Sequence, residues 1–292
     1  MNTKNFISKE RLQQYYLLMR MDRPIGTYLL LWPTFWALWI AAEGIPPVPI
    51  VIIFTLGVFV MRSAGCVIND YADRKIDKHI ERTQNRPITS GKVSPAEALI
   101  LFAVCILIAF ILVLFLNLFT ILLSFAALLL ASVYPFMKRY THYPQIVLGM
   151  AFSWAIPMGF AAQLNEIPMI AWFLYIVNIL WIICYDTMYA MVDKEDDLKI
   201  GVKSTAIVFA ENDKLIIALL QTAFLIGMLV IAWQLQAGMF FYLGIAAAMI
   251  FSLYQQYLIR NREKKLCFQA FLNNNWLGMV IFIGIFLNYL PW

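Results

Sequence analysis

Asparagine and aspartate residues recur at intervals of four in one short stretch of the sequence. Asn69, Asp73 and Asp77 are spaced in this way, and Asp70 stands beside them. A helix advances about 100° per residue, so it would bring the three spaced residues into an arc of about 80°. One helix face at the end of an apolar run would then be lined with oxygen ligands.

A second cluster with the same character follows more than a hundred residues later. Asp186, Asp193 and Asp197 would lie within about 40° of one another on a helix, with Tyr189 near that face. Like charges at this spacing repel each other, so we expect a cation to hold each cluster. Hard oxygen ligands without histidine or cysteine suit Mg²⁺, which typically takes one or two carboxylates plus phosphate oxygens.

The two clusters together therefore predict a paired Mg²⁺ site for a diphosphate. The predicted metal ligands are Asn69, Asp70, Asp73, Asp77, Asp186, Asp193 and Asp197. An ordinary solvated loop of mixed charge is the plain alternative, but it does not explain two clusters with matching spacing. A carboxylate-based transport pathway is a second alternative, although transport carboxylates usually lie near the middle of a span.

Basic residues near the clusters are candidates for clamping an anionic substrate, because Lys and Arg form charge-assisted hydrogen bonds with phosphate. Several lie in the loop 81–92, which also contains Arg82. Each alone could equally snorkel or set membrane topology. The predicted substrate-binding residues are Arg23, Arg62, Arg74, Arg86, Lys92, Lys138, Arg139, Tyr189 and Lys203.

The elements that must position these residues are membrane-spanning helices. Of 292 residues, 62% are hydrophobic and only 13% are charged, whereas soluble domains carry roughly 25% charged residues. The apolar runs are continuous and do not alternate, which excludes a transmembrane barrel. We predict an all-α, polytopic membrane protein with nine helices over residues 25–43, 48–68, 96–115, 118–137, 144–163, 167–188, 213–234, 238–258 and 270–290.

The charges fall almost entirely on one side of these spans. All 22 Lys and Arg lie before the first helix, in alternate connections or at helix ends facing that side, and only Glu43 and Glu166 lie on the other. The positive-inside rule then predicts a cytoplasmic N-terminus, an outer C-terminus at Pro291-Trp292, and carboxylate clusters that face the cytoplasm. We expect one membrane domain over 1–292, with residues 1–22 as a cytosolic N-terminal segment.

Two further features predict no chemistry of their own. The four cysteines have no metal-type spacing and are expected to be buried hydrophobes. Asn273, Asn274 and Asn275 open the last predicted helix, where they would cap it or form interhelical hydrogen bonds.

The paired motifs, Asn69-Asp-x-x-Asp73-x-x-x-Asp77 and Asp186-x-x-Tyr189-Ala190-x-x-Asp193-x-x-x-Asp197, resemble the signatures of the UbiA superfamily of intramembrane aromatic prenyltransferases. The resemblance covers nearly the whole chain. Four phrases resemble the bacterial branch that prenylates 4-hydroxybenzoate: MDRPIGTYLLLWPTFW (21–36), GCVINDYADRK (65–75), YPFMKRYTH (134–142) and YDTMYAMVD (185–193).

The resemblance implies nine helices around a central cavity, with cytosolic cap loops, in the bacterial inner membrane. It implies Mg²⁺ as cofactor and polyprenyl diphosphate and 4-hydroxybenzoate as substrates in ubiquinone biosynthesis, with no nucleic-acid partner. Asp73, Asp193 and Arg139 are then the expected catalytic residues. Asp193 would draw the phenol proton, and Arg139 would hold the benzoate carboxylate by bidentate hydrogen bonds. A naphthoate or homogentisate acceptor remains open, as does, less favourably, the transporter.

Overall fold

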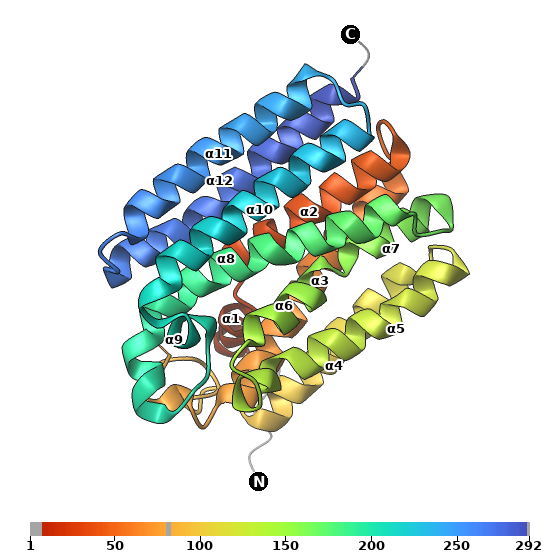
Figure 1. Ribbon diagram of the computed structural model, residues 1–292. Helices are drawn as coiled ribbons and strands as arrows, with labels where there is room; N and C mark the ends of the chain where they lie inside the picture. The colour runs from red at the N-terminus through yellow and green to blue at the C-terminus, as the bar shows by residue number, and fades with distance from the viewer. Residues whose placement is uncertain (1–7, 80–82, 291–292) are drawn as a thin grey trace.

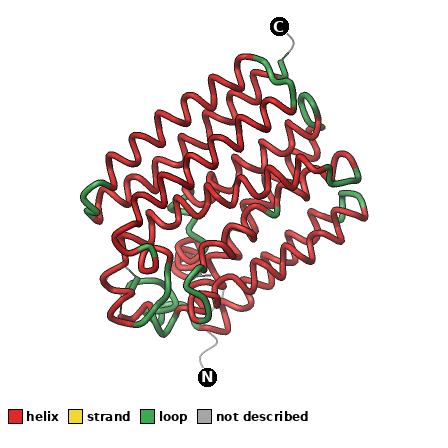
Figure 2. The backbone as a smooth tube through the Cα atoms, in the orientation of Figure 1, coloured by secondary structure: helices red, strands yellow, loops and turns green. Residues whose placement is uncertain are grey.

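The computed structural model describes residues 8–79 and 83–290, and within these ranges the chain is helical without a strand. Long helices run alongside one another and are joined by short loops (Figures 1 and 2). The α-helices are α1 (Lys9–Leu18), α2 (Ile25–Ala42), α3 (Val48–Asp73), α4 (Pro95–Val113), α5 (Leu118–Val133), α6 (Pro144–Ser153), α7 (Ala155–Leu164), α8 (Met169–Ile200), α9 (Thr205–Val208), α10 (Asp213–Gln234), α11 (Met239–Ile259) and α12 (Lys264–Asn288).

The prediction of nine spans is confirmed for the described chain, in which nine helical segments are long and apolar enough to cross a membrane. The main differences are in the bounds. The helix predicted over 48–68 continues to Asp73, and the one predicted over 167–188 continues to Ile200. Both carboxylate motifs therefore begin on the long helices themselves, and the helical backbone fixes the positions of their first residues.

Proline interrupts two of the spans, because it lacks an N–H and its ring clashes with the preceding turn. Pro135 falls where α5 ends at Val133, and the chain continues as the 3₁₀ helix η2 (Tyr134–Arg139). Pro157 follows the break at Trp154 that separates α6 from α7. The first interruption turns Lys138 and Arg139 towards the end of α3.

The core is an aromatic cluster shared by α2, α8, α10 and α12. The rings of Trp36 and Trp181 are tilted against each other at 5.3 Å between centroids, and Trp181 stacks on Phe224 at 5.8 Å. The indole of Trp36 donates to the Gly278 carbonyl oxygen at 3.1 Å, and that of Trp181 donates to Asn274 Oδ1 at 2.8 Å. These bonds satisfy polar groups that would be costly in an apolar interior.

The Asn273–Asn275 stretch lies well inside α12, which begins nine residues earlier at Lys264. Capping is therefore excluded, and the interhelical alternative is correct. Besides the bond to Asn274, Trp32 donates to Asn275 Oδ1 at 2.8 Å and Gln255 donates to Asn273 Oδ1 at 3.0 Å. The trio ties α12 to α2, α8 and α11.

The polar N-terminal stretch forms α1, which docks on the start of α4. Arg11 pairs with Glu97, and the Tyr15 hydroxyl donates to Glu97 Oε1 at 3.1 Å. Burial, and then the hydrogen bond to Glu97, raise the pKa of Tyr15. Beyond α1 the backbone turns through the left-handed region at Arg20, with φ of 56°. This turn directs the Arg20 side chain towards α3.

Candidate active site

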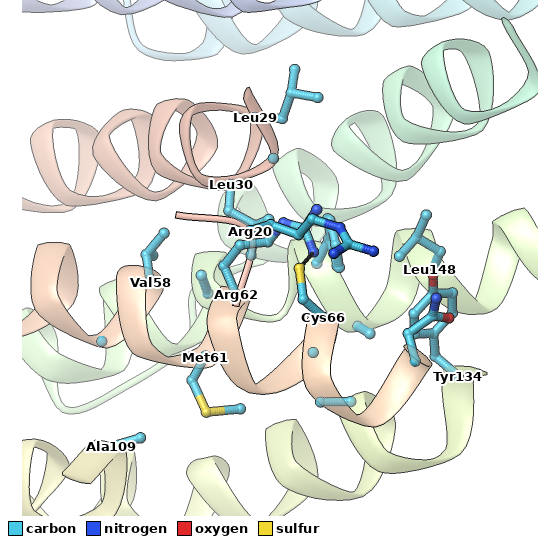
Figure 3. Close-up of a pocket in the computed structure, with 18 of the residues that line it drawn as sticks. Arg20, Leu29, Leu30, Val58, Met61, Arg62, Cys66, Ala109, Tyr134 and Leu148 are labelled. Carbon is cyan, nitrogen blue, oxygen red and sulfur yellow. Dashed lines mark hydrogen bonds between the residues drawn. The ribbon is translucent and has the colours of Figure 1, made fainter. Parts of the chain in front are cut away.

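A cavity of about 560 Å³ lies between α2, α3, α4, α5, α6 and α8. Figure 3 shows residues from several of these helices pointing into it, with Arg20 and Arg62 near its centre. Asn69, Asp70 and Asp186 line one part of the cavity, whereas apolar side chains of α4 and α5 such as Phe110 and Leu128 line another. The cavity is thus polar at one pole and hydrocarbon-like at the other.

The first motif forms the polar pole. Asp70 is 2% exposed, and its carboxylate accepts two hydrogen bonds from Arg20 Nη2, at 3.1 Å and 2.9 Å. Arg86 Nη1 lies 2.9 Å from Asp70 Oδ1 and 2.8 Å from Asp77 Oδ2. Two arginines thus balance the buried carboxylates, as charges in such a site require.

The expectation that Asn69, Asp73 and Asp77 share one continuous helix face is only partly correct. α3 ends at Asp73, and Asp77 opens the 3₁₀ helix η1 (Asp77–His79). Asp73 is 2% exposed and pairs with Lys138 through Oδ2, whereas its Oδ1 has no hydrogen-bond partner among the described residues. The motif therefore has one buried carboxylate oxygen, Asp73 Oδ1, that lacks a hydrogen-bond partner and could bind a metal ion.

The second motif lies on the second half of α8. Asp186 and Tyr189 line the cavity, so this helix faces the first motif across it. Asp193 and Asp197 lie further along α8, beyond the residues that line the cavity; Asp193 is half-buried and Asp197 is 8% exposed. The structure therefore brings Asn69, Asp70 and Asp186 into one chamber.

Arg62 lies deeper in the cavity than the first motif, about 12 Å before Asp70 along α3 at 1.5 Å per residue. Its Nη1 donates to Cys66 Sγ at 2.6 Å, and Figure 3 shows the two side chains joined. Tyr134 and Tyr185 line the same region. In the described chain, Arg20 and Arg86 pair with carboxylates, whereas Arg62 pairs with a thiol.

The other predicted substrate-binding residues divide into two groups. Arg23 lines the cavity although its side chain is 72% exposed. Arg74, Lys92, Lys138, Arg139 and Lys203 are not part of the lining. Arg82 lies outside the described residues.

Three of the residues away from the lining have clear structural contacts. Arg74 lies over the Tyr71 ring at 4.2 Å and donates to the Tyr71 carbonyl oxygen. Arg139 donates to the Ala72 carbonyl oxygen at the end of α3. The Lys203 backbone N–H donates to the Lys138 carbonyl oxygen at 3.4 Å. These residues support the end of α3 and its neighbours.

Sequence reasoning missed Arg20 and Asn85. Arg20 and Asn85 line the cavity, and Arg20 is a main partner of Asp70. Arg20 was one of several basic residues before the first span, and no spacing rule distinguished it.

The donor set fits a hard divalent cation that is shared with a substrate. Within residues 8–79 and 83–290, no three His, Cys, Asp or Glu side chains lie close enough to form a metal site by themselves. Mg²⁺ needs no such cage, because it usually combines one or two carboxylates with phosphate oxygens and water. The unsatisfied Asp73 Oδ1 and the carboxylates of Asp70 and Asp186 are ligands of the kind it prefers.

Comparison with known proteins gives the same fold and names a family. The chain is 58% identical to 4-hydroxybenzoate octaprenyltransferase of Psychromonas ingrahamii over 98% of the chain and 100% of that protein. It is equally similar to the enzyme of the same name from Vibrio vulnificus, over 97% and 100%.

Among solved structures, a UbiA homologue from Aeropyrum pernix superposes with a TM-score of 0.80 at 23% identity, over 91% of this chain and 99% of that one. A UbiA homologue from Archaeoglobus fulgidus, solved bound to GPP and Mg²⁺, gives 0.71 at 18% identity, over 94% and 99%. The family model for UbiA prenyltransferases matches residues 30–283. The chain belongs to the UbiA prenyltransferase family.

Proposed function

We propose that this protein transfers a polyprenyl group from polyprenyl diphosphate to carbon 3 of 4-hydroxybenzoate, releasing diphosphate, in ubiquinone biosynthesis. The names of its full-length relatives support the acceptor. The observation that carries the proposal is the division of one cavity into a charged pole at Asp70 and Asp186 and an apolar chamber beside it. A diphosphate with a long hydrocarbon tail has the same division.

At the charged pole, the chain's own residues hold the leaving group. Arg20 and Arg86 flank Asp70, and Lys138 pairs with Asp73. Asn69, Asp70, Asp73, Asp77, Asp186, Asp193 and Asp197 form the proposed Mg²⁺-binding set. When bound, Mg²⁺ would neutralise the negative charge that grows on diphosphate as the carbon–oxygen bond breaks.

The apolar chamber excludes water from the reacting carbon. Side chains of α4 and α5 line it, including Ile106, Phe110 and Leu128. Without water nearby, the allylic carbon reacts with the aromatic ring and is not hydrolysed. A new bond then joins the allylic carbon to carbon 3, and the proton of carbon 3 is lost.

Arg62 is placed to hold the carboxylate of the aromatic acid. Its guanidinium projects into the cavity and pairs with the Cys66 thiol. A bound carboxylate would replace this thiol, which is a weak hydrogen-bond acceptor, with a strong, charged one. Because Arg62 lies deeper in the cavity than the first motif, a carboxylate bound to it would be kept apart from the diphosphate. The phenol end of the bound 4-hydroxybenzoate would then point towards Asp186. The geometry thus favours Arg62 over Arg139 for this role.

Arg139 contributes by holding the end of α3 through the Ala72 carbonyl oxygen. The role of Asp193 in drawing the phenol proton stays a prediction, since Asp193 lies two turns beyond Asp186 on α8. We place the protein in the bacterial inner membrane, with the N-terminus and the carboxylates towards the cytoplasm. The asymmetric distribution of Lys and Arg supports this orientation.

An acceptor panel tests the proposal. Purified protein in lipid is given a polyprenyl diphosphate, Mg²⁺ and one of 4-hydroxybenzoate, a dihydroxynaphthoate or homogentisate. We expect prenylated 4-hydroxybenzoate, and we expect EDTA to abolish its formation and excess Mg²⁺ to restore it. Preferential prenylation of another acceptor, or full activity in EDTA, would contradict the proposal.

A further inference from the structure

Three cationic side chains from separate segments neutralise the first carboxylate motif. Arg20 follows α1, Arg86 lies in the connection between η1 and α4, and Lys138 lies on η2. Their partners are the three aspartates of the motif, Asp70, Asp73 and Asp77. Each of these aspartates is only 2% exposed, so each needs a partner of opposite charge. The positive and negative charges of the cluster are therefore equal in number.

The Asp70 carboxylate has little capacity for a further ligand. A carboxylate offers about four lone-pair sites. Arg20 Nη2 donates to both oxygens of Asp70, at 3.1 Å and 2.9 Å, and Arg86 Nη1 lies 2.9 Å from Oδ1. The same Arg86 nitrogen lies 2.8 Å from Asp77 Oδ2. A metal ion that binds Asp70 or Asp77 must therefore compete with a guanidinium group.

The charge of the cluster also disfavours a metal ion that arrives alone. Mg²⁺ would add two positive charges to a buried group of side chains that is already neutral, and uncompensated charge is costly away from water. A diphosphate supplies negative charge, and its oxygens accept strong, bidentate hydrogen bonds from arginine. Because Arg20 and Arg86 both line the cavity, their guanidinium groups can reach a diphosphate bound there.

We infer that Arg20 and Arg86 make metal binding conditional on the diphosphate. The two arginines hold Asp70 and Asp77 until diphosphate oxygens accept their hydrogen bonds, and the carboxylates then become available to Mg²⁺. The inference rests on the proposed function, because it requires the first motif to bind the metal ion. By thermodynamic linkage, the metal ion and the diphosphate each strengthen the binding of the other by the same factor.

Removing one arginine tests this competition, because it should strengthen the binding of the metal ion alone. Arg86→Gln releases Asp70 Oδ1 and Asp77 Oδ2 from the same guanidinium group. Arg20→Gln is the second variant, because it releases Asp70 from its other partner. Lys75→Gln is the matched control: it also removes one positive charge between Asp73 and Asp77, but Lys75 is exposed and does not line the cavity.

The readout is the binding of Mn²⁺, a paramagnetic substitute for Mg²⁺, measured by electron paramagnetic resonance without acceptor and without turnover. Each protein is titrated alone and with geranyl diphosphate, and a titration without protein corrects for Mn²⁺ bound by the diphosphate itself. Geranyl diphosphate should strengthen Mn²⁺ binding to the unmodified protein roughly tenfold or more. Arg86→Gln alone should bind Mn²⁺ roughly tenfold more tightly than the unmodified protein alone.

The same variant should gain less from geranyl diphosphate, since one of the two competing groups is gone. Lys75→Gln should match the unmodified protein in both titrations. A residue that only grips the diphosphate would leave the binding of Mn²⁺ alone unchanged, and a residue that only supports the fold would weaken it. The direction of the change in Arg86→Gln therefore separates the three roles.

Three results would overturn the inference. These are a folded Arg86→Gln protein that binds Mn²⁺ alone no more tightly than the unmodified protein, equal tightening by Lys75→Gln, or no effect of geranyl diphosphate on the unmodified protein. If Arg86→Gln does not fold, Arg20→Gln decides. Failure of the proposed function is recognised separately, as Mn²⁺ binding that depends on geranyl diphosphate in a protein that does not prenylate 4-hydroxybenzoate.

Discussion

Replacing Gly26 with alanine should weaken the binding of 4-hydroxybenzoate, and it should do so only by displacing the Arg62 side chain. Gly26 lies in the first turn of α2 and lines the cavity. A Cβ atom at this position would lie 2.1 Å from Arg62 Nε and 2.4 Å from its Nη2. Ordinary contact begins at 3.4 Å, so the guanidinium must retreat by about 1.3 Å. The end of a flexible side chain beside a cavity can make this movement, and the protein should still fold.

The size of the effect follows from the bonds that the guanidinium would lose. Hydrogen bonds to a charged group contribute about 1.5–3 kcal/mol, and 1.4 kcal/mol corresponds to about tenfold in affinity. Complete loss, in Arg62→Gln, should raise the KM for 4-hydroxybenzoate roughly 10- to 100-fold. A displacement of about 1.3 Å keeps part of the interaction, so we expect Gly26→Ala to raise this KM about tenfold.

The assay is steady-state kinetics in which each substrate is varied while the other is saturating. The KM for polyprenyl diphosphate should not change, and the preference for 4-hydroxybenzoate over its neutral methyl ester should shrink. Gly57→Ala is the control, since Gly57 lines the same cavity and a Cβ there meets nothing within 4 Å. An unchanged KM for the acid in both Gly26→Ala and Arg62→Gln would refute the reasoning.

Two further predictions concern the motifs and the helix packing. Asp73→Ala and Asp193→Ala should each abolish turnover. A cooperative thermal unfolding transition in detergent should show that both variants are folded. Activity close to that of the unmodified protein in either variant would exclude that residue from the site. Gly284→Ala should destabilise the protein by about 1–3 kcal/mol, because its Cβ would lie 2.8 Å from the Phe240 carbonyl oxygen. Gly65→Ala, where a Cβ meets nothing within 4 Å, is the control for that measurement, and equal unfolding midpoints would contradict the packing argument.

The membrane fold and the general place of the chemistry were predictable from local patterns. Apolar runs of sufficient length locate spans because bilayer thickness fixes the helix length. The regular spacing of Asn69, Asp73, Asp186 and Asp193 identified the motif helices because spacing along a helix determines which side chains share a face. Such information is contained within a few turns of one helix.

Contacts between distant segments were not predictable in the same way. Arg20 reaches Asp70 across 50 residues because α1 docks on α4 and the chain then turns at a positive φ. Gln145 meets Thr205 across 60 residues, through packing of α6 on α8. The end of α3 at Asp73, which separates Asp77 from the helical face, likewise has no clear sequence signal.

Product analysis after reaction with isotopically labelled 4-hydroxybenzoate tests the proposed transfer most directly. Purified protein, Mg²⁺ and a polyprenyl diphosphate should yield labelled acid carrying the prenyl group on carbon 3, with one diphosphate released for each molecule formed. Diphosphate release without prenylation of the acid, or a prenyl group attached to oxygen, would contradict the proposed function.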